Sequence, residues 1–457
     1  MITDDQRHAL EQIQAAPTRF HNLSDAGNAL RFADQHGHRL RFNAASGKWL
    51  IWSFSFWSED RDGEVMRLAK ATARSIFTEA AAEEDEATRK KLAGHAVKTE
   101  AKSRLEAMVA LASSEPGIVV LPEQLDKNPD LLACPNVTID LRTGEAKAPD
   151  PDDLITRSTG IHFSPDAECP RFLRFLLEVF EGDQELADFI QRWVGYILTG
   201  HTTEHAFLLA YGPKGRGGKS VLANVLRKLL GDYAAVADFE TFTRTRGDQG
   251  PRNDLARLDG VRAVFASEGQ AGRRLDEATV KQLTGGDPVV ARFLYAETFE
   301  YLPQFKLWLT TNRRPRIDGG DEAIWSRVRE IPFMADFRGR EDRNLEQTLQ
   351  AELPGILNWA IQGTLKWRKH GLGTAQAIEA STADYRAGED ILGSFLADRC
   401  ELDGETLTAA FREAFEAYCE ELGEDPPNAR ILGRELATRG ISRGGAGRRY
   451  YRGVRVK

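Results

Sequence analysis

The stretch that decides the fold is residues 206–231, which read AFLLAYGPKGRGGKSVLANVLRKLLG. Residues 206–211 form a short apolar run, which predicts a buried strand. From position 221 onward apolar residues recur at helical spacing until Gly231, a residue type that commonly ends helices. A glycine-rich loop separates the two. Because glycines let backbone N–H groups face inward and a helix N-terminus carries positive potential, this order predicts a phosphate site.

The end of the loop fits the phosphate-loop pattern G-x-x-x-x-G-K-[ST]. Its first glycine would fall at Pro213, whereas Gly212 stands one residue earlier, so the loop is one residue longer than the standard form. We predict that Lys219 contacts the β- and γ-phosphates and that Ser220 ligates Mg²⁺. A glycine loop without a ligand is the alternative. The predicted nucleotide-binding residues are Gly212, Pro213, Lys214, Gly215, Arg216, Gly217, Gly218, Lys219, Ser220 and Val221.

A catalytic carboxylate is expected at the end of a second buried strand. Residues 261–268 supply apolar positions followed by Glu268, the candidate base that orients the attacking water. Ser267 precedes it where such strands often carry Asp, so metal binding would rest mainly on Ser220 and water. A surface glutamate that follows a core strand is the plain alternative for Glu268.

Two further candidates lie downstream. Residues 305–311 predict a third strand, and Asn312 at its end is placed to sense the γ-phosphate. Arg327 and Arg329 flank an apolar position; an arginine supplied across a subunit boundary can stabilise the charge of phosphoryl transfer, and Arg327 is the first candidate, with Arg329 in reserve. A turn-forming asparagine and ion-paired arginines on an edge strand are the alternatives.

Composition sets the class of protein. The 457 residues are 41% hydrophobic, enough for real cores, and their length suggests about three domains. The net charge of −8 argues against a generally basic nucleic-acid coat but permits a local basic patch. We find no apolar run long enough to span a membrane, no signal-peptide layout and no Cys-x-x-Cys spacing among four cysteines. We therefore expect a cytoplasmic protein with no membrane partner and no zinc site.

Three domains can be delimited. In residues 1–170, the aromatic alternation over 49–57 predicts a hairpin, and an Ala-rich charged stretch over 64–111 predicts helices. Residues 171–375 alternate short apolar runs with helices, which is typical of an α/β domain. Residues 385–457 predict short helices and a final strand over 450–456.

The C-terminal end is strongly basic. Glu435 is the only acid among residues 428–457, which gives a local formal charge of +8. Together with Tyr450 and Tyr451, this favours contact with nucleic-acid phosphates. A solvated tail, or a surface for the acidic remainder of the protein, is the alternative. The basic residues are Arg430, Arg434, Arg439, Arg443, Arg448, Arg449, Arg452, Arg455 and Lys457.

Taken in order, these motifs resemble the superfamily-3 helicases, an AAA+ class of phage, plasmid and viral replication proteins. The nearest resemblance is to the phage/plasmid primase–helicase C-terminal family, with a poxvirus-type N-terminal helical region. It covers most of the chain, from about residue 23 to the end. The stretches that carry it are residues 25–29, 47–52, 128–132, 139–144, 274–277, 280–288, 291–295, 305–308 and 323–327, with Asn312 and Pro315.

The resemblance implies an AAA+ P-loop core after a mostly helical α+β domain and before a winged-helix-like domain. It implies a ring, usually a hexamer, with Glu268, Asn312 and an in-trans Arg327 around ATP and Mg²⁺. Residues 289–302 would form a DNA-facing hairpin. Its expected tip, residues 296–299, carries Glu297 instead of lysine, so phosphate tracking by the tip is not expected, and Phe299 fits a core position. The DNA-contact candidates are Lys281, Arg292, Arg448 and Arg449, with the wing turn at residues 444–447.

The implied function is an ATP-dependent DNA helicase that translocates on single-stranded or forked DNA in the replication of a phage, plasmid or other mobile element. Only about twenty residues precede the resemblance, and they lack a carboxylate-rich motif, so we expect no primer synthesis by this chain and a separately encoded primase as partner. Two alternatives stand: an ATP-controlled origin-binding initiator or loader that unwinds little, and a DNA-independent, defence-type AAA+ ATPase.

Overall fold

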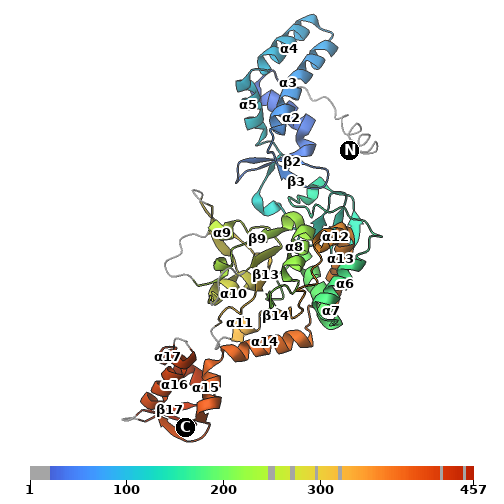
Figure 1. The fold of residues 1–457 in the computed structure, drawn as a ribbon. Helices are drawn as coiled ribbons and strands as arrows, with labels where there is room; N and C mark the ends of the chain where they lie inside the picture. Colours follow the sequence, from blue (N-terminus) through green and yellow to red (C-terminus); the bar gives the residue numbers. More distant parts are fainter. Residues whose placement is uncertain are drawn as a thin grey trace.

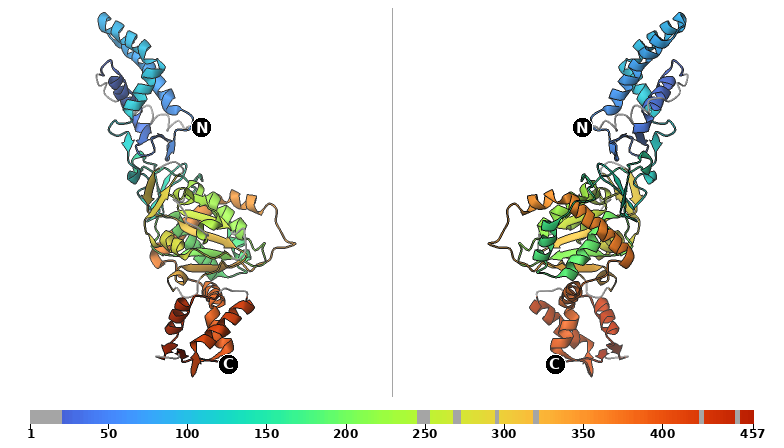
Figure 2. Two further views of the ribbon diagram at one scale, coloured as in Figure 1. Left: turned by 90° about the vertical axis from the view of Figure 1, so that its left-hand side faces the viewer. Right: turned by 90° about the vertical axis from the view of Figure 1, so that its right-hand side faces the viewer.

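The computed structural model describes residues 21–244, 253–267, 273–293, 297–317, 322–422, 426–445 and 449–457. Figure 1 shows three parts in line: an N-terminal helical part, a central part built on a parallel sheet, and a small C-terminal part. The side views in Figure 2 show the same arrangement, with the N-terminal helices and the C-terminal part at opposite ends.

The N-terminal part packs helices on a small sheet in the order β3-β2-β1-β4. Strands β2 and β3 pair antiparallel, which confirms the hairpin predicted from the aromatic alternation, and three helices fill the Ala-rich stretch. Trp57 is fully buried, and its ring N–H donates to the Pro151 carbonyl at 2.9 Å. The elements are α2 Asp25–His36, β1 Leu40–Asn43, β2 Lys48–Trp52, β3 Trp57–Glu59, α3 Glu64–Ala82, α4 Glu86–Thr99, α5 Lys102–Ala112 and β4 Val119–Val120.

His36, at the end of α2, makes the stability of this part depend on pH. Burial, aided by the nearby Arg39, lowers the pKa of His36 from 6.5 to about 4. The unfolded chain therefore binds a proton that the folded one does not, so the stabilisation is complete above pH 6.5 and is lost as pH falls towards 4. We expect hydrogen exchange in α2 and α3 to report a loss on the order of 2–3 kcal/mol over this window. In His36→Gln the loss should shrink; an equal loss in the variant contradicts the assignment.

A three-stranded sheet, β5-β6-β7, connects the first part to the second. Leu132, Ile139 and Leu141 are fully buried in the same core as the central helices. This segment of the predicted N-terminal region therefore packs with the central part. The strands are β5 Leu131–Ala133, β6 Thr138–Asp140 and β7 Glu145–Lys147, and the short 3-10 turns of the chain are η1 Gly37–Arg39, η2 Pro122–Gln124, η3 Pro151–Asp153, η4 Gly231–Tyr233 and η5 Phe239–Phe242.

The central sheet has the order β14-β8-β13-β10-β9, and all its pairings are parallel. Of these five strands, the first along the chain, β8, lies between the last, β14, and β13. Because the strands are parallel, their carboxyl ends meet at one edge. All six residues of β13 are buried. The strands are β8 Phe207–Tyr211, β9 Ala234–Val236, β10 Ala263–Ser267, β13 Lys306–Thr311 and β14 Val328–Pro332.

Both faces of the sheet are covered, as expected for an α/β domain. Leu208 and Ala210 of β8 pack into the core formed with α6, α7, α8, α12 and α13, whereas Phe207 and Leu209 pack into the core of the other face. Figure 1 shows α8 and α13 on one side of the sheet and α9 and α10 on the other. The elements are α6 Pro170–Val179, α7 Gln184–Leu198, α8 Lys219–Leu230, α9 Asn253–Ala256, α10 Glu277–Gly285, β11 Val289–Arg292, β12 Thr298–Tyr301, α11 Glu322–Trp325, α12 Leu345–Ala351 and α13 Leu353–His370.

Two buried cations tie the end of α7 to the sheet. Arg262, just before β10, donates to the Leu198 carbonyl at 2.5 Å, and Lys306, at the start of β13, donates to the Thr199 carbonyl at 2.5 Å. Burial lowers the pKa of Lys306 well below its ordinary value and lowers the pKa of Arg262. The carbonyls at a helix C-terminus attract positive charge. These residues therefore fix the helix that precedes β8.

The C-terminal part has its own core around Phe395, Phe411, Phe415 and Tyr451. The structure corrects one prediction here: residues 450–456 form two strands, not one, because Gly453 turns the backbone at φ +89°. No helix within the described ranges is long and apolar enough to cross a membrane. The elements are α14 Gln376–Glu389, α15 Ile391–Arg399, β15 Cys400–Glu401, β16 Glu405–Leu407, α16 Thr408–Leu422, α17 Ala429–Thr438, β17 Ser442–Gly444, β18 Tyr450–Arg452 and β19 Arg455–Val456.

Candidate nucleotide site

The glycine-rich loop joins β8 to α8 at the carboxyl edge of the sheet. Its backbone is left-handed at Gly215, Arg216 and Gly218, and α8 begins at Lys219. A Cβ on Gly218 would lie 2.6 Å from the Val179 side chain of α6, at φ +86°. Only glycine fits such a position. The strand, loop and helix predicted from the sequence are therefore present, and the loop is held against α6.

The backbone N–H groups of this loop are available to a ligand. Those of Gly217, Gly218 and Lys219 donate to no acceptor in the part of the chain that the structure describes. Unpaired N–H groups at the start of a helix bind anions, and the helix dipole adds positive potential there. The loop thus fits a phosphate group chemically.

Lys219 and Asn312, 93 residues apart in the sequence, meet at this edge. The Lys219 ammonium donates to the Asn312 side-chain oxygen at 3.0 Å and to the Gly212 carbonyl at 2.7 Å. Lys219 is 6% exposed, and burial lowers its pKa. A Cβ on Gly212 would lie 2.6 Å from the ammonium, so this glycine makes the close approach. The structure therefore brings together the cation and the amide that we expected to act on phosphate.

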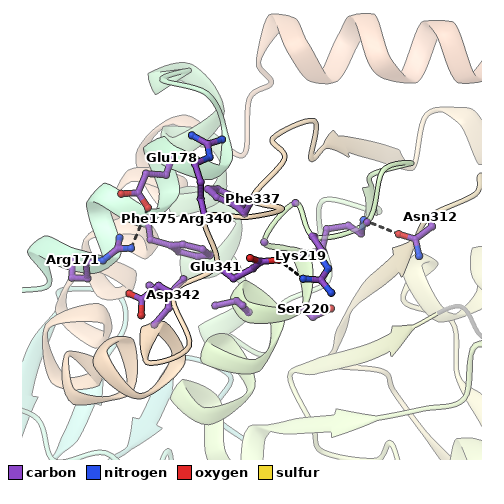
Figure 3. A pocket seen from close by; sticks show the side chains of 16 residues that line it. Arg171, Phe175, Glu178, Lys219, Ser220, Asn312, Phe337, Arg340, Glu341 and Asp342 are labelled. Carbon is purple, nitrogen blue, oxygen red and sulfur yellow. Dashed lines mark hydrogen bonds and ion pairs between the residues drawn. The ribbon is translucent and has the colours of Figure 1, made fainter.

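A cavity of about 390 Å³ opens beside the loop. Figure 3 shows its residues, with Lys219 pointing towards Asn312. One wall is residues 333–342, which follow β14 and are called the strap from here on. The strap lies against the loop, because the Phe337 N–H donates to the Arg216 carbonyl at 3.3 Å and the Arg216 side chain forms an ion pair with Glu341. The lining residues that the sequence did not reveal are Arg171, Phe175, Glu178, Phe337, Arg340, Glu341, Asp342 and Leu345.

Of the other residues predicted to bind nucleotide, some line the cavity and some do not. Ser220 is exposed in the first turn of α8 and lines the cavity, where its hydroxyl is a suitable ligand for Mg²⁺. Val221 is half-buried and also lines the cavity, whereas Pro213 and Lys214 are exposed and do not. In the described ranges, no group of three His, Cys, Asp or Glu side chains is arranged to hold a metal.

The candidate base, Glu268, lies outside the described residues. The strand before it, β10, pairs in parallel with β13 up to Ser267 and Thr310. The chain therefore leaves β10 at the edge that carries Asn312. The catalytic assignment of Glu268 stays a prediction.

Arg327 lies at the opposite edge of the sheet from Lys219. It directly precedes β14, and its carbonyl accepts from Phe207 at the start of β8 at 2.9 Å. Its guanidinium donates to the Ala323 carbonyl at 2.7 Å, and that of Arg329 donates to the Ser326 carbonyl at 2.7 Å. The structure does not bring Arg327 to the loop of its own chain, so its role across a subunit boundary remains a prediction.

Arg314 is a structural residue that the sequence did not reveal. It follows Asn312 by two positions, stacks over the Tyr211 ring at 4.7 Å and pairs with the fully buried Glu330 at 2.7 Å. Burial raises the pKa of Glu330, while Arg314 opposes this shift. The pair joins the ends of β8, β13 and β14 and thereby holds the loop that carries Asn312. In the sequence, Arg314 is recognisable only as a basic residue that follows a predicted strand. Such residues are too common for this position to predict a structural role.

The predicted hairpin exists as β11 and β12. Its expected tip needs correction: Thr298 and Phe299 lie in β12, paired with Arg292 and Ala291, so these two residues belong to the strand and not to the tip. Phe299 is half-buried against the core, as expected. Arg292 is exposed at the end of β11, and Lys281 is half-buried on α10.

The C-terminal basic residues fall into two groups. Three are paired with acids of neighbouring elements: Arg439 with Asp390 at 2.6 Å, Arg452 with Glu405 at 3.0 Å and Arg455 with Glu401 at 3.9 Å. Arg448 lies outside the described residues. The exposed residues without an ion pair in the described ranges are Arg430 and Arg434 on α17, Arg443 on β17, Arg449 just before β18, and Lys457 at the end of the sequence.

Comparison with known proteins finds two matching family models and several viral relatives of similar sequence. A family model described as "D5 N terminal like" matches residues 29–181, and one described as "Family of unknown function (DUF5906)" matches residues 210–327. Putative helicase L207/L206 of Acanthamoeba polyphaga mimivirus is 28% identical over 296 residues, covering 60% of this chain and 31% of that protein. Putative helicase 022R of Frog virus 3 (isolate Goorha) is 33% identical over 172 residues, covering 36% and 18%. The chain thus spans at most about a third of these relatives.

Among solved structures, the apo structure of the NrS-1 C terminal region superposes with a TM-score of 0.50 at 11% identity, covering 92% of this chain and 96% of that one. This similarity shows a shared mixed α/β fold. The family matches, the helicase-named viral relatives and the shared fold agree with the order of motifs along the sequence. The family-model match over residues 29–181 and the viral relatives named as putative helicases support the resemblance to the primase–helicase family that the sequence indicated.

Proposed function

We propose that the chain is an ATP-dependent DNA helicase that uses Mg²⁺ and serves the replication of a phage, plasmid or other mobile element. The observation that carries the proposal is the meeting of Lys219 with Asn312 beside a loop with unpaired N–H groups, at the carboxyl edge of a parallel sheet. In such sheets ligands bind at this edge. The helicase-named viral relatives support the choice of DNA as substrate.

The chemistry assigned to the site is hydrolysis of the γ-phosphate. A water oxygen attacks the γ-phosphorus, the bond from that phosphorus to the bridging oxygen breaks, and Glu268 takes the proton of the water. Lys219 and the loop N–H groups bind the phosphate oxygens, and Asn312 positions the γ-phosphate and water. When bound, Mg²⁺ neutralises phosphate charge, with the Ser220 hydroxyl as a ligand.

The position of Arg327 supports a ring. Since it lies at the edge of the sheet opposite its own glycine loop, it can complete a nucleotide site only in a neighbouring copy of the chain. We infer a homo-oligomer, with a hexamer as the expected form from the family, in which each subunit supplies Arg327 to the next.

DNA contact is assigned to two surfaces. The order of helix α15, strand β16, helices α16 and α17 and hairpin β17–β18 supports the winged-helix-like domain implied by the sequence, with the unpaired arginines on its last helix and hairpin. The hairpin of β11 and β12 presents Arg292 and Val290 to solvent while Val289 and Ala291 anchor it. This second surface is the one expected to meet single-stranded DNA.

Strand displacement from forked DNA tests the proposal. We expect ATP hydrolysis that DNA stimulates and that releases the displaced strand, and Glu268→Gln should retain ATP binding but lose turnover, because an amide cannot accept the proton. Binding and hydrolysis without strand release would favour an initiator or loader. Hydrolysis indifferent to DNA would favour a defence-type ATPase.

A further inference from the structure

Helix α14 follows the predicted central domain, which ends at residue 375, but it packs on the central sheet. Figure 1 shows it beside the edge strand β14. Tyr385 of α14 is 1% exposed, and its ring meets that of Trp325 edge-on with the centroids 5.0 Å apart, inside the core of the central part. The N–H of Glu330 on β14 donates to the Thr382 hydroxyl at 3.2 Å. The helix is therefore fixed to the sheet that carries the nucleotide site.

Residues 312–317, called the β13 loop from here on, leave β13 and lie along this helix. The Tyr385 hydroxyl donates to the Pro315 carbonyl, and the Ile317 N–H donates to the Glu389 carboxylate at 3.0 Å. The two helix residues are four positions apart, so they share one face of α14. Both contacts are made with the backbone of the loop. They therefore fix the path of the chain and not the side chain of one loop residue.

The buried contacts of the β13 loop are its main anchors. Arg314 also reaches α14, where its Nη1 donates to Asp384 at 2.8 Å, but the Asp384 side chain is 74% exposed. An ion pair in such a position contributes little to stability. Pro315 and Ile317 are buried, by contrast, and a buried backbone group that loses its hydrogen-bond partner costs free energy.

The first residue of the β13 loop is Asn312, which is exposed and whose side-chain oxygen accepts from Lys219 at 3.0 Å. A triphosphate on the glycine loop offers its own oxygens to the Lys219 ammonium. The contact with Lys219 therefore cannot by itself position the amide during hydrolysis. The position of the amide then depends on the backbone, which is held by β13 on one side and by the anchored β13 loop on the other.

We propose that Tyr385 and Glu389 are positioning residues for Asn312. Neither lines the cavity, and they act on hydrolysis by holding the β13 loop so that the amide faces the γ-phosphate. The proposal rests on the proposed function, because Asn312 needs a nucleotide on which to act. It extends the nucleotide site to the helix that joins the central part to the C-terminal part, since α14 ends at Glu389 and α15 begins at Ile391.

The rate of ATP hydrolysis and the affinity for ATP, both measured with Mg²⁺ on the full-length chain, test the two residues. Tyr385→Phe removes the hydroxyl and keeps the ring in the core, and Glu389→Ala removes the acceptor of the Ile317 N–H. We expect each to lower kcat about tenfold and to change ATP affinity by less than about twofold, because misplacing a group that acts in the transition state lowers the rate and not binding.

Two further variants separate positioning from a general effect on the helix. Glu389→Gln keeps an acceptor oxygen, so its kcat should recover to within about threefold of the wild type, a neutral acceptor being weaker than a carboxylate. Arg386→Gln is the matched control. It breaks an ion pair of the same helix with Glu322 on α11, which is not part of the β13 loop, and it should hydrolyse ATP at the wild-type rate.

The same two changes made in Asn312→Ala decide whether they act through the amide. In that background Tyr385→Phe and Glu389→Ala should change the residual rate by less than about twofold, because the residue that they position is absent. A tenfold loss in that background, a tenfold loss of ATP affinity, or the wild-type kcat in both variants overturns the proposal, while hydrolysis by the wild-type chain leaves the proposed function standing. If the wild-type chain hydrolyses no ATP, both fail.

Discussion

Lys219→Ala is expected to lower ATP hydrolysis by about a hundredfold or more, which is the usual cost of removing one positioned donor to developing charge. The ammonium sits on the Gly212 carbonyl and the Asn312 oxygen, within reach of a phosphate held by the loop. Alanine removes the positive charge and the link to Asn312 together. Steady-state hydrolysis at saturating ATP and Mg²⁺, with direct measurement of nucleotide binding, checks the result.

Lys228→Ala is the matched control. Lys228 is exposed on the last turn of the same helix, lies outside the cavity and is not expected to touch nucleotide. The control should hydrolyse ATP at the wild-type rate, and both variants should show the wild-type circular dichroism. Normal hydrolysis by Lys219→Ala would contradict the assignment of the glycine loop to phosphate binding. It would also contradict the assignment of Asn312 to positioning the γ-phosphate and water.

The sequence predicted this loop well because the evidence is local. Apolar runs of strand length, a glycine cluster and helical periodicity are contiguous over residues 206–231, and the structure places β8, the loop and α8 there. The end of the later strand β13 could also be predicted, because a contiguous apolar run marks it. Asn312 follows a fully buried strand, and parallel pairing carries it to the loop.

The cavity wall outside the glycine loop could not be predicted, because nothing local marks it. The Arg171 N–H contacts Glu352, 181 residues away, and the strap reaches the loop only through the pairing of β14 with β8. The position of Arg327 was hidden for a related reason. Its residue type and spacing indicate a position beside an edge strand. Whether it lies at the amino or the carboxyl ends of the strands depends on strand direction and register.

Loss of the unpaired C-terminal arginines is expected to weaken DNA binding and to reduce its dependence on salt. Replacing Arg430, Arg434, Arg443 and Arg449 together with glutamine removes four exposed charges that have no ion pair in the described ranges. If each contacts one phosphate, the slope of log affinity against log salt should fall by about 3–4. Affinity for forked DNA, measured by fluorescence anisotropy over a series of salt concentrations, gives this slope.

The N-terminal part supplies a control of equal charge. Lys90, Lys91, Lys98 and Lys102 are exposed on α4 and α5, and their replacement with glutamine changes the net charge of the chain by the same amount. A general field effect predicts equal losses in the two variants, because long-range attraction depends on total charge. Direct phosphate contact predicts that only the C-terminal variant loses slope, because counterions are released where cations meet the DNA backbone. Equal slopes in the C-terminal variant and the wild type would assign these four arginines to the solvated surface. The candidates for DNA contact would then be Lys281, Arg292 with its hairpin, and Arg448.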